Sequence, residues 1–437
     1  MEWWISLTLI IGGLMGLLIT GMPVAFCFIV VNLFGAYFLW DGVIGFYQLG
    51  DSIFSSVSTF SLLPVPLFVI MGEVLFHSQI ALKAIDVVDK WLGKMPGRLG
   101  VLALASGTMF SCLSGSSIGT TAMLGSVMIP DMEKRGYHPS ISIGSCMCGA
   151  LAMIIPPSAL AVILAAIANV SVGKMLIGGI LPGLLLATLY IAYIVGRCYF
   201  QPEMAPSYTP EPIPFSEKIR VTVKYIFPLG FVIFSVIGLI FLGIATPTES
   251  AAMGAMSTFI LAACYKRLNL ELFKKSLAGT LRITVMMFLI VTGSLAFSQI
   301  LAYSGATSSL VAVVTSLPLP PLVLMISMQF VILILGMFME QVSIMLITLP
   351  IFMPMVTALG FNEIWFALIM LVNLEVAMET PPFGFLLFVM KGVVPKHISM
   401  GDVYKAILPF IIIDVSVMIL MLLFPDIVLW LPEHAFK

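Results

Sequence analysis

The chain has 437 residues, of which 60% are hydrophobic and only 9% are charged, and its mean hydropathy is +1.15. Soluble domains carry about 25% charged residues, so the composition excludes a soluble protein and indicates a polytopic helical membrane protein. The formal net charge of -1 leaves no basic surface for nucleic acid.

Ten apolar segments are predicted to cross the bilayer, because each can span a hydrocarbon layer about 30 Å thick. They are residues 4–20, 23–40, 61–77, 139–169, 175–199, 222–243, 247–265, 281–300, 362–393 and 405–430. Amphipathic stretches between the spans, such as 80–91 and 270–277, are predicted to lie in the membrane interface as helices. We expect these helices to form a rigid frame.

Two other apolar segments, about 98–130 and about 320–357, are too long for a single span. Polar residues interrupt the first at Ser114-Gly115-Ser116-Ser117, and the second is interrupted at 336–341. Each segment is therefore predicted to enter the membrane and return to the same side as a re-entrant hairpin.

Matching residues occur in the same order in the two halves of the chain, at nearly constant spacing. The pairs are Pro23 with Pro247, Gly72 with Gly293, Pro130 with Pro354, Pro156-Pro157 with Pro381-Pro382, and Pro182 with Pro409. Each half has five spans, an odd number, so the second half must enter the membrane from the opposite face. The sequence thus predicts an all-α membrane protein with two inverted-topology repeats, 1–200 and 219–437, joined by a Pro-rich linker at 201–218.

The basic residues of the loops predict the orientation. With the N-terminus outside, 18 of the 20 Lys and Arg residues fall on the cytoplasmic side, and only Lys174 and Lys437 fall outside. The positive-inside rule then places both termini outside and the 201–218 linker in the cytoplasm. The first hairpin opens from the cytoplasm and the second from outside.

The hairpin tips and the breaks at 156–157 and 381–382 are candidate binding sites. Irregular backbone at membrane depth is tolerated only where it is enclosed or lines a cavity. Freed carbonyls and hydroxyls suit Na⁺, and helix N-termini suit carboxylates. The alternative is that each Pro-Pro pair only kinks a helix.

Acidic residues within spans are candidates for function because they are costly to bury. Glu340 and Glu379 lie beside the second tip and the second break, where a carboxylate balances Na⁺, accepts a proton, or caps and links helices. Glu375 lies one turn before Glu379 on the same helix face. Glu73, Glu249 and Asp414 are interpreted as structural.

At these motifs the sequence resembles the large membrane subunit of tripartite ATP-independent periplasmic (TRAP) transporters. The resemblance covers essentially the whole chain and rests on these motifs: 21–26 (GMPVAF), 66–72 (PLFVIMG), 97–100 (GRLG) leading into 114–117 (SGSS), 155–158 (IPPS), 245–249 (ATPTE) and 380–384 (TPPFG). Glu379 departs from the pattern, since an apolar residue is expected there.

The resemblance implies an elevator-type, Na⁺-coupled importer of an organic acid in the bacterial inner membrane. It also implies two partners, a small four-span membrane subunit and a periplasmic substrate-binding protein, and no cofactor besides Na⁺ as the coupling ion. One Na⁺ site is expected near each tip and break, with substrate between them. The implied Na⁺ ligands are Ser114, Gly115, Ser117, Pro156, Gly336, Met339, Thr380, Pro381 and Gly384. The implied substrate-binding residues are Ser116, Ser117, Thr120, Ser158, Gln341 and Thr380.

Two other functions remain open. A stand-alone dicarboxylate/Na⁺ symporter of related architecture would need no binding protein. A membrane-embedded enzyme would need a catalytic constellation, such as paired His and acids, and none is visible. The phosphate-binding GxxxxGK[ST] motif is missing as well, so ATP hydrolysis by the chain is not predicted.

Overall fold

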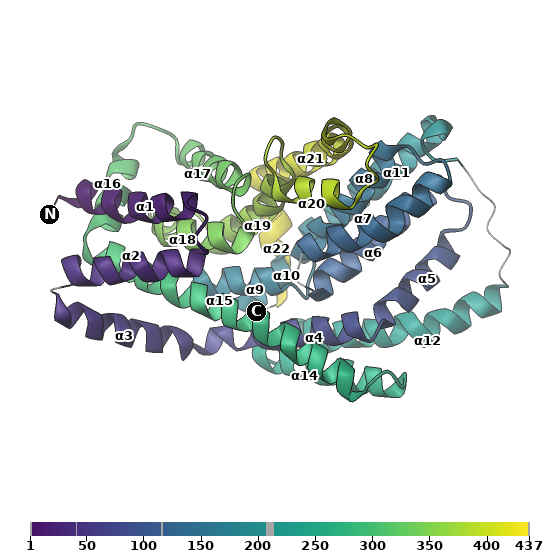
Figure 1. The fold of residues 1–437 in the computed structure, drawn as a ribbon, viewed down its shortest axis with the longest axis horizontal. Helices are drawn as coiled ribbons and strands as arrows, with labels where there is room; N and C mark the ends of the chain where they lie inside the picture. Colours follow the sequence, from purple (N-terminus) through teal and green to yellow (C-terminus); the bar gives the residue numbers. More distant parts are fainter. Residues whose placement is uncertain (1, 41, 115–116, 207–213, 436–437) are drawn as a thin grey trace.

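The computed structural model describes residues 2–40, 42–114, 117–206 and 214–435, without the side chains at 61, 81, 82, 112–114 and 150–152. All regular structure in these ranges is helical (Figure 1). The first half contains α1 (Trp3–Ile19), α2 (Val24–Leu39), α3 (Val43–Val57), η1 (Phe60–Leu62), α4 (Pro64–His77), α5 (Ile80–Leu92), α6 (Arg98–Ser114), α7 (Ser117–Lys134), α8 (Pro139–Cys148), η2 (Gly149–Ile154), α9 (Ala159–Ile167), α10 (Val172–Gly178), α11 (Ile180–Phe200) and η3 (Pro202–Met204). The second half contains α12 (Phe215–Ile233), η4 (Phe234–Gly238), α13 (Leu239–Phe241), α14 (Pro247–Cys264), α15 (Leu270–Tyr303), α16 (Ala306–Ser316), α17 (Pro321–Gly336), α18 (Gln341–Ala358), α19 (Glu363–Glu379), α20 (Phe385–Val393), α21 (Met400–Leu423) and α22 (Asp426–Ala435).

The helices of the two halves follow one another in the same order. Two N-terminal spans (α1 and α2, or α12 and α14) precede a hairpin (α6–α7, or α17–α18) and a broken span (α8–α9, or α19–α20), and a long helix follows (α11, or α21). By length and composition, five described segments are each able to cross a bilayer: 172–200, 215–241, 270–303, 341–358 and 400–423. The predicted all-α membrane fold with two inverted repeats is confirmed.

Three predicted boundaries were wrong. Residues 270–277 are not a separate interface helix but the first two turns of α15, because Asn269 caps the helix and nothing breaks it before Tyr303. The predicted span 405–430 is two helices, α21 and α22, which end and begin around Pro425. The predicted linker 201–218 is shorter than expected because α12 already begins at Phe215; residues 207–213 of the linker lie outside the described residues.

Local capping residues begin several helices. The hydroxyl of Thr246 accepts a hydrogen bond from the Glu249 backbone N–H, and the Glu249 carboxylate accepts one from the Thr246 N–H at 2.8 Å. Ser399 and Asp402 form the same capping box at the start of α21. Each box satisfies two N–H groups that a helix end leaves unpaired. This agrees with the structural interpretation of Glu249.

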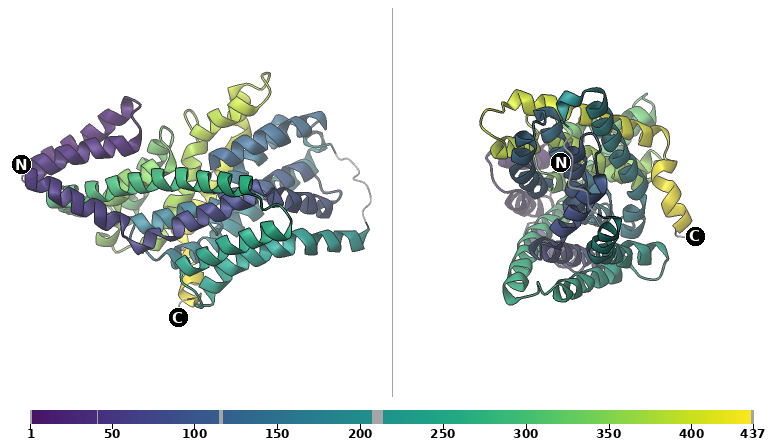
Figure 2. Two further views of the ribbon diagram at one scale, coloured as in Figure 1. Left: turned by 60° about the horizontal axis from the view of Figure 1, so that its bottom comes forward. Right: turned by 90° about the vertical axis from the view of Figure 1, so that its right-hand side faces the viewer.

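A frame is formed by α1–α4 and α12–α15. α4 packs against α14 and α15. The long helix α15 also packs against α2 and α3 along its course (Figure 1). Phe28 and Phe297 pack edge to face with ring centroids 5.3 Å apart, and Asn32 donates a hydrogen bond of 2.7 Å to the Gly293 carbonyl. Glycine is required at 293, because a Cβ there would lie 2.7 Å from the Cβ of Phe28. Two further views show α12–α14, in teal, along one edge of the molecule (Figure 2).

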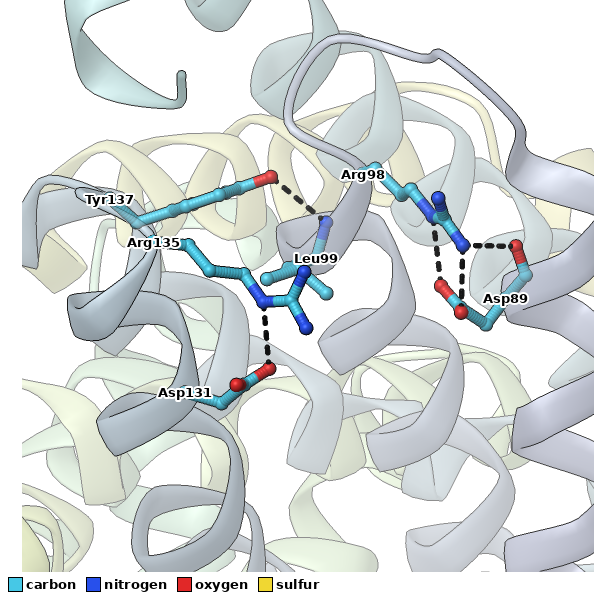
Figure 3. A network of polar contacts seen from close by, with 6 residues as sticks. All are labelled: Asp89, Arg98, Leu99, Asp131, Arg135 and Tyr137. Carbon is cyan, nitrogen blue, oxygen red and sulfur yellow. Dashed lines mark hydrogen bonds and ion pairs between the residues drawn. The ribbon is translucent and has the colours of Figure 1, made fainter. Parts of the chain in front are cut away.

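The remaining hairpins and broken helices, α6–α11 and α17–α22, form what we call the core. The first hairpin is anchored at its base (Figure 3). Arg98, the first residue of α6, forms an ion pair of 2.7 Å with Asp89 of α5, and Tyr137 accepts a hydrogen bond from the Leu99 backbone N–H at 3.2 Å. Because α5 packs against both α6 and α12, it connects the first hairpin with the frame.

Candidate ion and substrate site

The tip of the first hairpin lies at the start of α7. Ser117 is the first residue of α7, and it is buried together with Thr120. Ser114 is the last residue of α6, and its side chain is not described. The predicted site residues Gly115 and Ser116 lie outside the described residues. Among the predicted site residues of this tip, Ser117 and Thr120 are therefore the two whose side chains the structure describes.

Ser117 joins the first hairpin to a helix of the second half. Its Oγ lies 2.7 Å from Oε1 of Glu375, in α19, and 2.7 Å from Sδ of Met153. A serine hydroxyl has one proton, and a carboxylate is a far stronger acceptor than a thioether, so Ser117 donates to Glu375. The Glu375 side chain is 2% exposed, and its Oε2 has no partner among the described residues. A buried acid therefore lies beside the first hairpin tip and the first break, which together we call the first cluster; the second tip and the second break form the second cluster.

The first break separates η2 from α9, as the proline pair predicts. Pro156 is buried, and the Pro156–Pro157 peptide bond is cis. Ser158 caps α9, since its Oγ accepts a hydrogen bond of 3.1 Å from the Ala161 N–H. The hydroxyl only accepts in this bond, so its own proton stays available to another acceptor. A substrate-binding role for Ser158 is compatible with this capping role.

The second hairpin turns between Gly336, the last residue of α17, and Gln341, the first residue of α18. Met339 lies in this turn and is partly exposed, and Gln341 is buried. A Cβ on Gly336 would lie 2.2 Å from the Cβ of Ala377, so only glycine permits this approach of α17 to α19. The Gln341 side chain approaches the carboxylate of Glu375. Both hairpin tips are thus brought to α19.

The second break follows α19 directly. Thr380 Oγ1 donates to the Val376 carbonyl at 2.6 Å, and the Gly384 N–H donates to the Thr380 carbonyl at 3.0 Å. A Cβ on Gly384 would lie 2.5 Å from the Met378 carbonyl oxygen. Pro381 is partly exposed, and the Pro381–Pro382 bond is cis. The turn thus brings the carbonyl oxygens of Met378 and Thr380 close to Gly384.

Two further acids are fully buried in the core. Glu379 has no partner for either carboxylate oxygen among the described residues, and it interacts electrostatically with Asp414 and Glu375. Asp414, in α21, accepts a hydrogen bond from the Tyr190 hydroxyl of α11. The sequence singled out Glu379 but assigned Asp414 a structural role only. Its place inside a span was the one signal that could have connected it with the other acids.

A cavity of about 230 Å³ lies between the frame and the first hairpin. Thr120 and Gly119 of α7 line it, and Glu73 of α4 faces it from the frame. The Glu73 carboxylate lies 3.2 Å from Nε2 of His77, one turn later on α4. Of the predicted substrate-binding residues that the structure describes, Thr120 lines this space. The Thr120 hydroxyl is buried and has no partner in the described chain.

Comparison with known proteins shows which family the chain resembles. The family model described as tripartite ATP-independent periplasmic transporter, DctM component, matches residues 11–427. The C4-dicarboxylate TRAP transporter large permease protein DctM of Pseudomonas aeruginosa is 32% identical over 390 residues, which cover 88% of this chain and 89% of that protein. The sialic acid TRAP transporter large permease protein SiaM of Vibrio cholerae is 29% identical and covers 96% of the chain, with 97% of its own length matched.

A solved structure shares the fold. The YdaH transporter of Alcanivorax borkumensis superposes with a TM-score of 0.63 at 14% sequence identity, over 88% of this chain and 90% of that protein. The similarity extends across both repeats. With the family match over most of its length, the chain belongs to the DctM-component family of tripartite ATP-independent periplasmic transporters and is a transporter permease, not an enzyme.

Proposed function

We propose that the chain imports an organic acid across the bacterial inner membrane, driven by Na⁺. The acid would be delivered by a periplasmic substrate-binding protein, and the chain would act with a small four-span membrane subunit. Relatives named for C4-dicarboxylates and for sialic acid support a carboxylate as substrate. The charge distribution of the loops supports periplasmic termini and a cytoplasmic 201–218 linker.

The observation that carries this proposal is the meeting of the two hairpins at α19. Ser117 from the first half contacts Glu375 of the second half, and the same helix ends at Thr380 in the second break. Oxygen atoms of side chains and of broken backbone are thus concentrated inside the core, where Na⁺ prefers them. In this proposal Ser117, Pro156, Thr380, Pro381 and Gly384 serve the two ion sites, and Ser158 and Gln341 contribute to substrate binding between them.

An elevator movement is proposed for the transport step. In it, the core moves as a unit against the frame and carries the bound ions and substrate across the membrane. The cavity between α4 and α7 supports such a boundary. Each net positive charge that moves inward gains about 2.3 kcal/mol per 100 mV, so an excess of Na⁺ over substrate charge makes import sensitive to voltage.

Uptake in proteoliposomes tests the function. Both membrane subunits are reconstituted, the cognate binding protein is loaded with succinate or with sialic acid, and an inward Na⁺ gradient is imposed. We expect uptake that stops when choline replaces Na⁺ and that increases with an inside-negative potential. Unchanged uptake in choline would contradict Na⁺ coupling. Uptake by this chain without the other two proteins would instead identify a stand-alone symporter.

A further inference from the structure

A groove runs along an exposed face of α11, toward the end of the helix. Its volume is about 410 Å³. The residues that line it are Ala192, Tyr193, Gly196, Arg197, Phe200 and Gln201. Small residues at 192 and 196 leave the space open, since a Cβ added at Gly196 would have no atom within 4 Å. The helix belongs to a segment that is long and apolar enough to cross a bilayer, so the groove lies on a membrane-spanning element.

Arg197 supplies the positive charge of the groove. Its Nη1 donates a hydrogen bond of 3.0 Å to the Tyr193 hydroxyl one turn earlier, and its guanidinium carbon lies 6.0 Å from the centre of the Tyr193 ring. Its Nε is buried without a hydrogen-bond partner, and it forms no ion pair among the described residues. A guanidinium has five N–H donors and a permanent charge, so the contact with Tyr193 does not satisfy it.

Tyr193 adds a second donor beside this charge. Its ring packs edge to face against Phe410 of α21, with ring centroids 5.1 Å apart, and this contact holds the ring in place. The hydroxyl accepts the hydrogen bond from Arg197, so its own proton stays available to another acceptor. The amide of Gln201 lines the end of the same groove. Donors grouped around one positive charge fit an anion with several oxygen atoms, such as a phosphate diester.

The rest of the groove suits a hydrocarbon chain. Phe200 is 82% exposed and Tyr199 is 68% exposed, and their rings pack edge to face. Aromatic side chains of this kind gather at the boundary between lipid and water, and Arg side chains near helix ends extend toward it. From Arg197 the groove continues to Ala192, about 7.5 Å along the helix axis toward the middle of the span. A ligand that fills it has an anionic end and an apolar end.

We propose that this groove binds an anionic phospholipid, with the phosphate at Arg197 and Tyr193 and one acyl chain along Gly196 and Ala192. The loop charges place this end of α11 on the cytoplasmic side, where anionic headgroups give the leaflet a negative potential. The phosphate provides the charge that the guanidinium lacks, and the acyl chain covers the open apolar part. The inference goes beyond the proposed function and does not depend on Na⁺ coupling.

A helix of another membrane protein is the competing occupant. Ala192 and Gly196 are small and four residues apart, a spacing that allows two helices to approach closely in a membrane. Such a helix would have to bring a carboxylate to Arg197 at the membrane boundary, because a buried charge is stable only when it is paired. A phospholipid already carries its negative charge at this depth, so the groove favours the lipid.

Lipid titration of the purified complex of both membrane subunits tests the site. The complex is delipidated in detergent, and phosphatidylglycerol or phosphatidylethanolamine with identical acyl chains is added while thermal unfolding is followed. We expect phosphatidylglycerol to stabilise the wild type at lower concentrations than phosphatidylethanolamine. In Arg197→Gln the phosphatidylglycerol concentration for half-maximal stabilisation should increase about fivefold, the contribution of one basic residue near anionic lipid.

Arg220→Gln is the matched control for the loss of charge. Arg220 is an exposed residue in the second turn of α12, predicted on the same side of the membrane, and it does not line the groove. Its titration should equal that of the wild type. Equal effects of Arg220→Gln and Arg197→Gln would overturn the site, and so would equal stabilisation of the wild type by the two lipids.

Gly196→Leu tests the groove without a change of charge. Leucine fills the open space, so this variant should also need more phosphatidylglycerol, and it serves in place of Arg197→Gln if that variant does not fold. A wild-type titration in Gly196→Leu would overturn the placement of the acyl chain. Equal stabilisation by inorganic phosphate would indicate a free anion instead of a lipid. Loss of the small membrane subunit from the Gly196→Leu complex would identify a contact between subunits, and either result would overturn the lipid site.

Discussion

The Arg98 guanidinium binds both the side-chain carboxylate and the backbone carbonyl of Asp89. Its Nη2 lies 2.7 Å from the Asp89 carboxylate and 3.0 Å from the Asp89 carbonyl oxygen, and its Nε lies 2.9 Å from the other carboxylate oxygen. The Arg98 side chain is 7% exposed and that of Asp89 is 32% exposed. The pair fixes the base of the first hairpin to α5, so it sets the position from which the Ser117 tip enters the core.

Loss of this pair should weaken the fold. Asp89→Ala leaves the Arg98 guanidinium largely buried without its carboxylate, and we expect the free energy of unfolding to decrease by about 1–3 kcal/mol. Partial exposure of Asp89 keeps the loss below that of a fully buried pair. Glu271→Ala, which breaks the exposed pair of Glu271 with Lys275, is the control and should change stability by less than about 0.5 kcal/mol. Thermal unfolding in detergent measures the stability of both variants. Equal losses of stability in Asp89→Ala and Glu271→Ala would contradict a stabilising role of the Arg98–Asp89 pair.

The close approach of α17 to α19 should tolerate no added methyl group. Gly336→Ala places a Cβ 2.2 Å from that of Ala377, and such overpacking costs about 1–3 kcal/mol. The second change Ala377→Gly removes the clashing atom and should restore most of the loss in the double variant. Gly196→Ala, in α11 with nothing within 4 Å of the new Cβ, should be neutral or stabilising. Failure of the double variant to recover stability would show that the contact is not the cause.

Removal of a hydroxyl from either cluster should weaken the Na⁺ dependence of uptake, so that more Na⁺ is needed. Ser117→Ala and Thr380→Ala each remove a group placed at a proposed ion site, and a lost hydrogen-bonding group costs about 1–3 kcal/mol. The Na⁺ concentration for half-maximal uptake should therefore increase roughly tenfold. Thr292→Ala is the matched control, since its hydroxyl also donates to a carbonyl one turn earlier, at 2.6 Å, but belongs to the frame. A Na⁺ titration that is unchanged in both cluster variants would show that the ion sites lie elsewhere.

The orientation of the chain is testable by labelling from outside the cell. In a background with Cys264 replaced by serine, a cysteine at Glu203 should react with a membrane-impermeant maleimide only after the membrane is permeabilised, because the positive-inside rule places the linker in the cytoplasm. A cysteine at Lys174, which is exposed, should react in intact spheroplasts. Reaction of the Glu203 position from outside would reverse the proposed topology.

The breaks in the chain were predictable because their causes are local. Proline lacks a backbone N–H, so the pairs at 156–157 and 381–382 predicted interruptions of the helices, and α19 ends at Glu379, two residues before the second pair. The short polar runs at 114–117 and 336–341 likewise predicted the hairpin tips. Such signals lie within a few residues of their effect.

The contacts that make the site were not predictable from local pattern. Ser117 and Glu375 are 258 residues apart in the chain, and nothing in either neighbourhood indicates the other. The start of α15 was mistaken for an interface helix because Lys274 and Lys275 give it an amphipathic pattern. The structure instead continues the helix without a break, since exposed Lys side chains are good helix formers and need no separate element.

The long helix α15 corresponds, in the other half of the frame, to two shorter helices with a break between them. With 34 residues it is about 50 Å long, more than the thickness of the hydrocarbon layer. The matching stretch of the first half is divided into α3 and α4 by the residues from Ser58 to Leu63. A continuous helix such as α15 transmits a tilt from one end to the other, whereas the interruption between α3 and α4 allows the two helices to change their relative angle. The two sides of the frame, which the repeat relates to each other, therefore differ in stiffness, and bending should be concentrated on the side of α3 and α4.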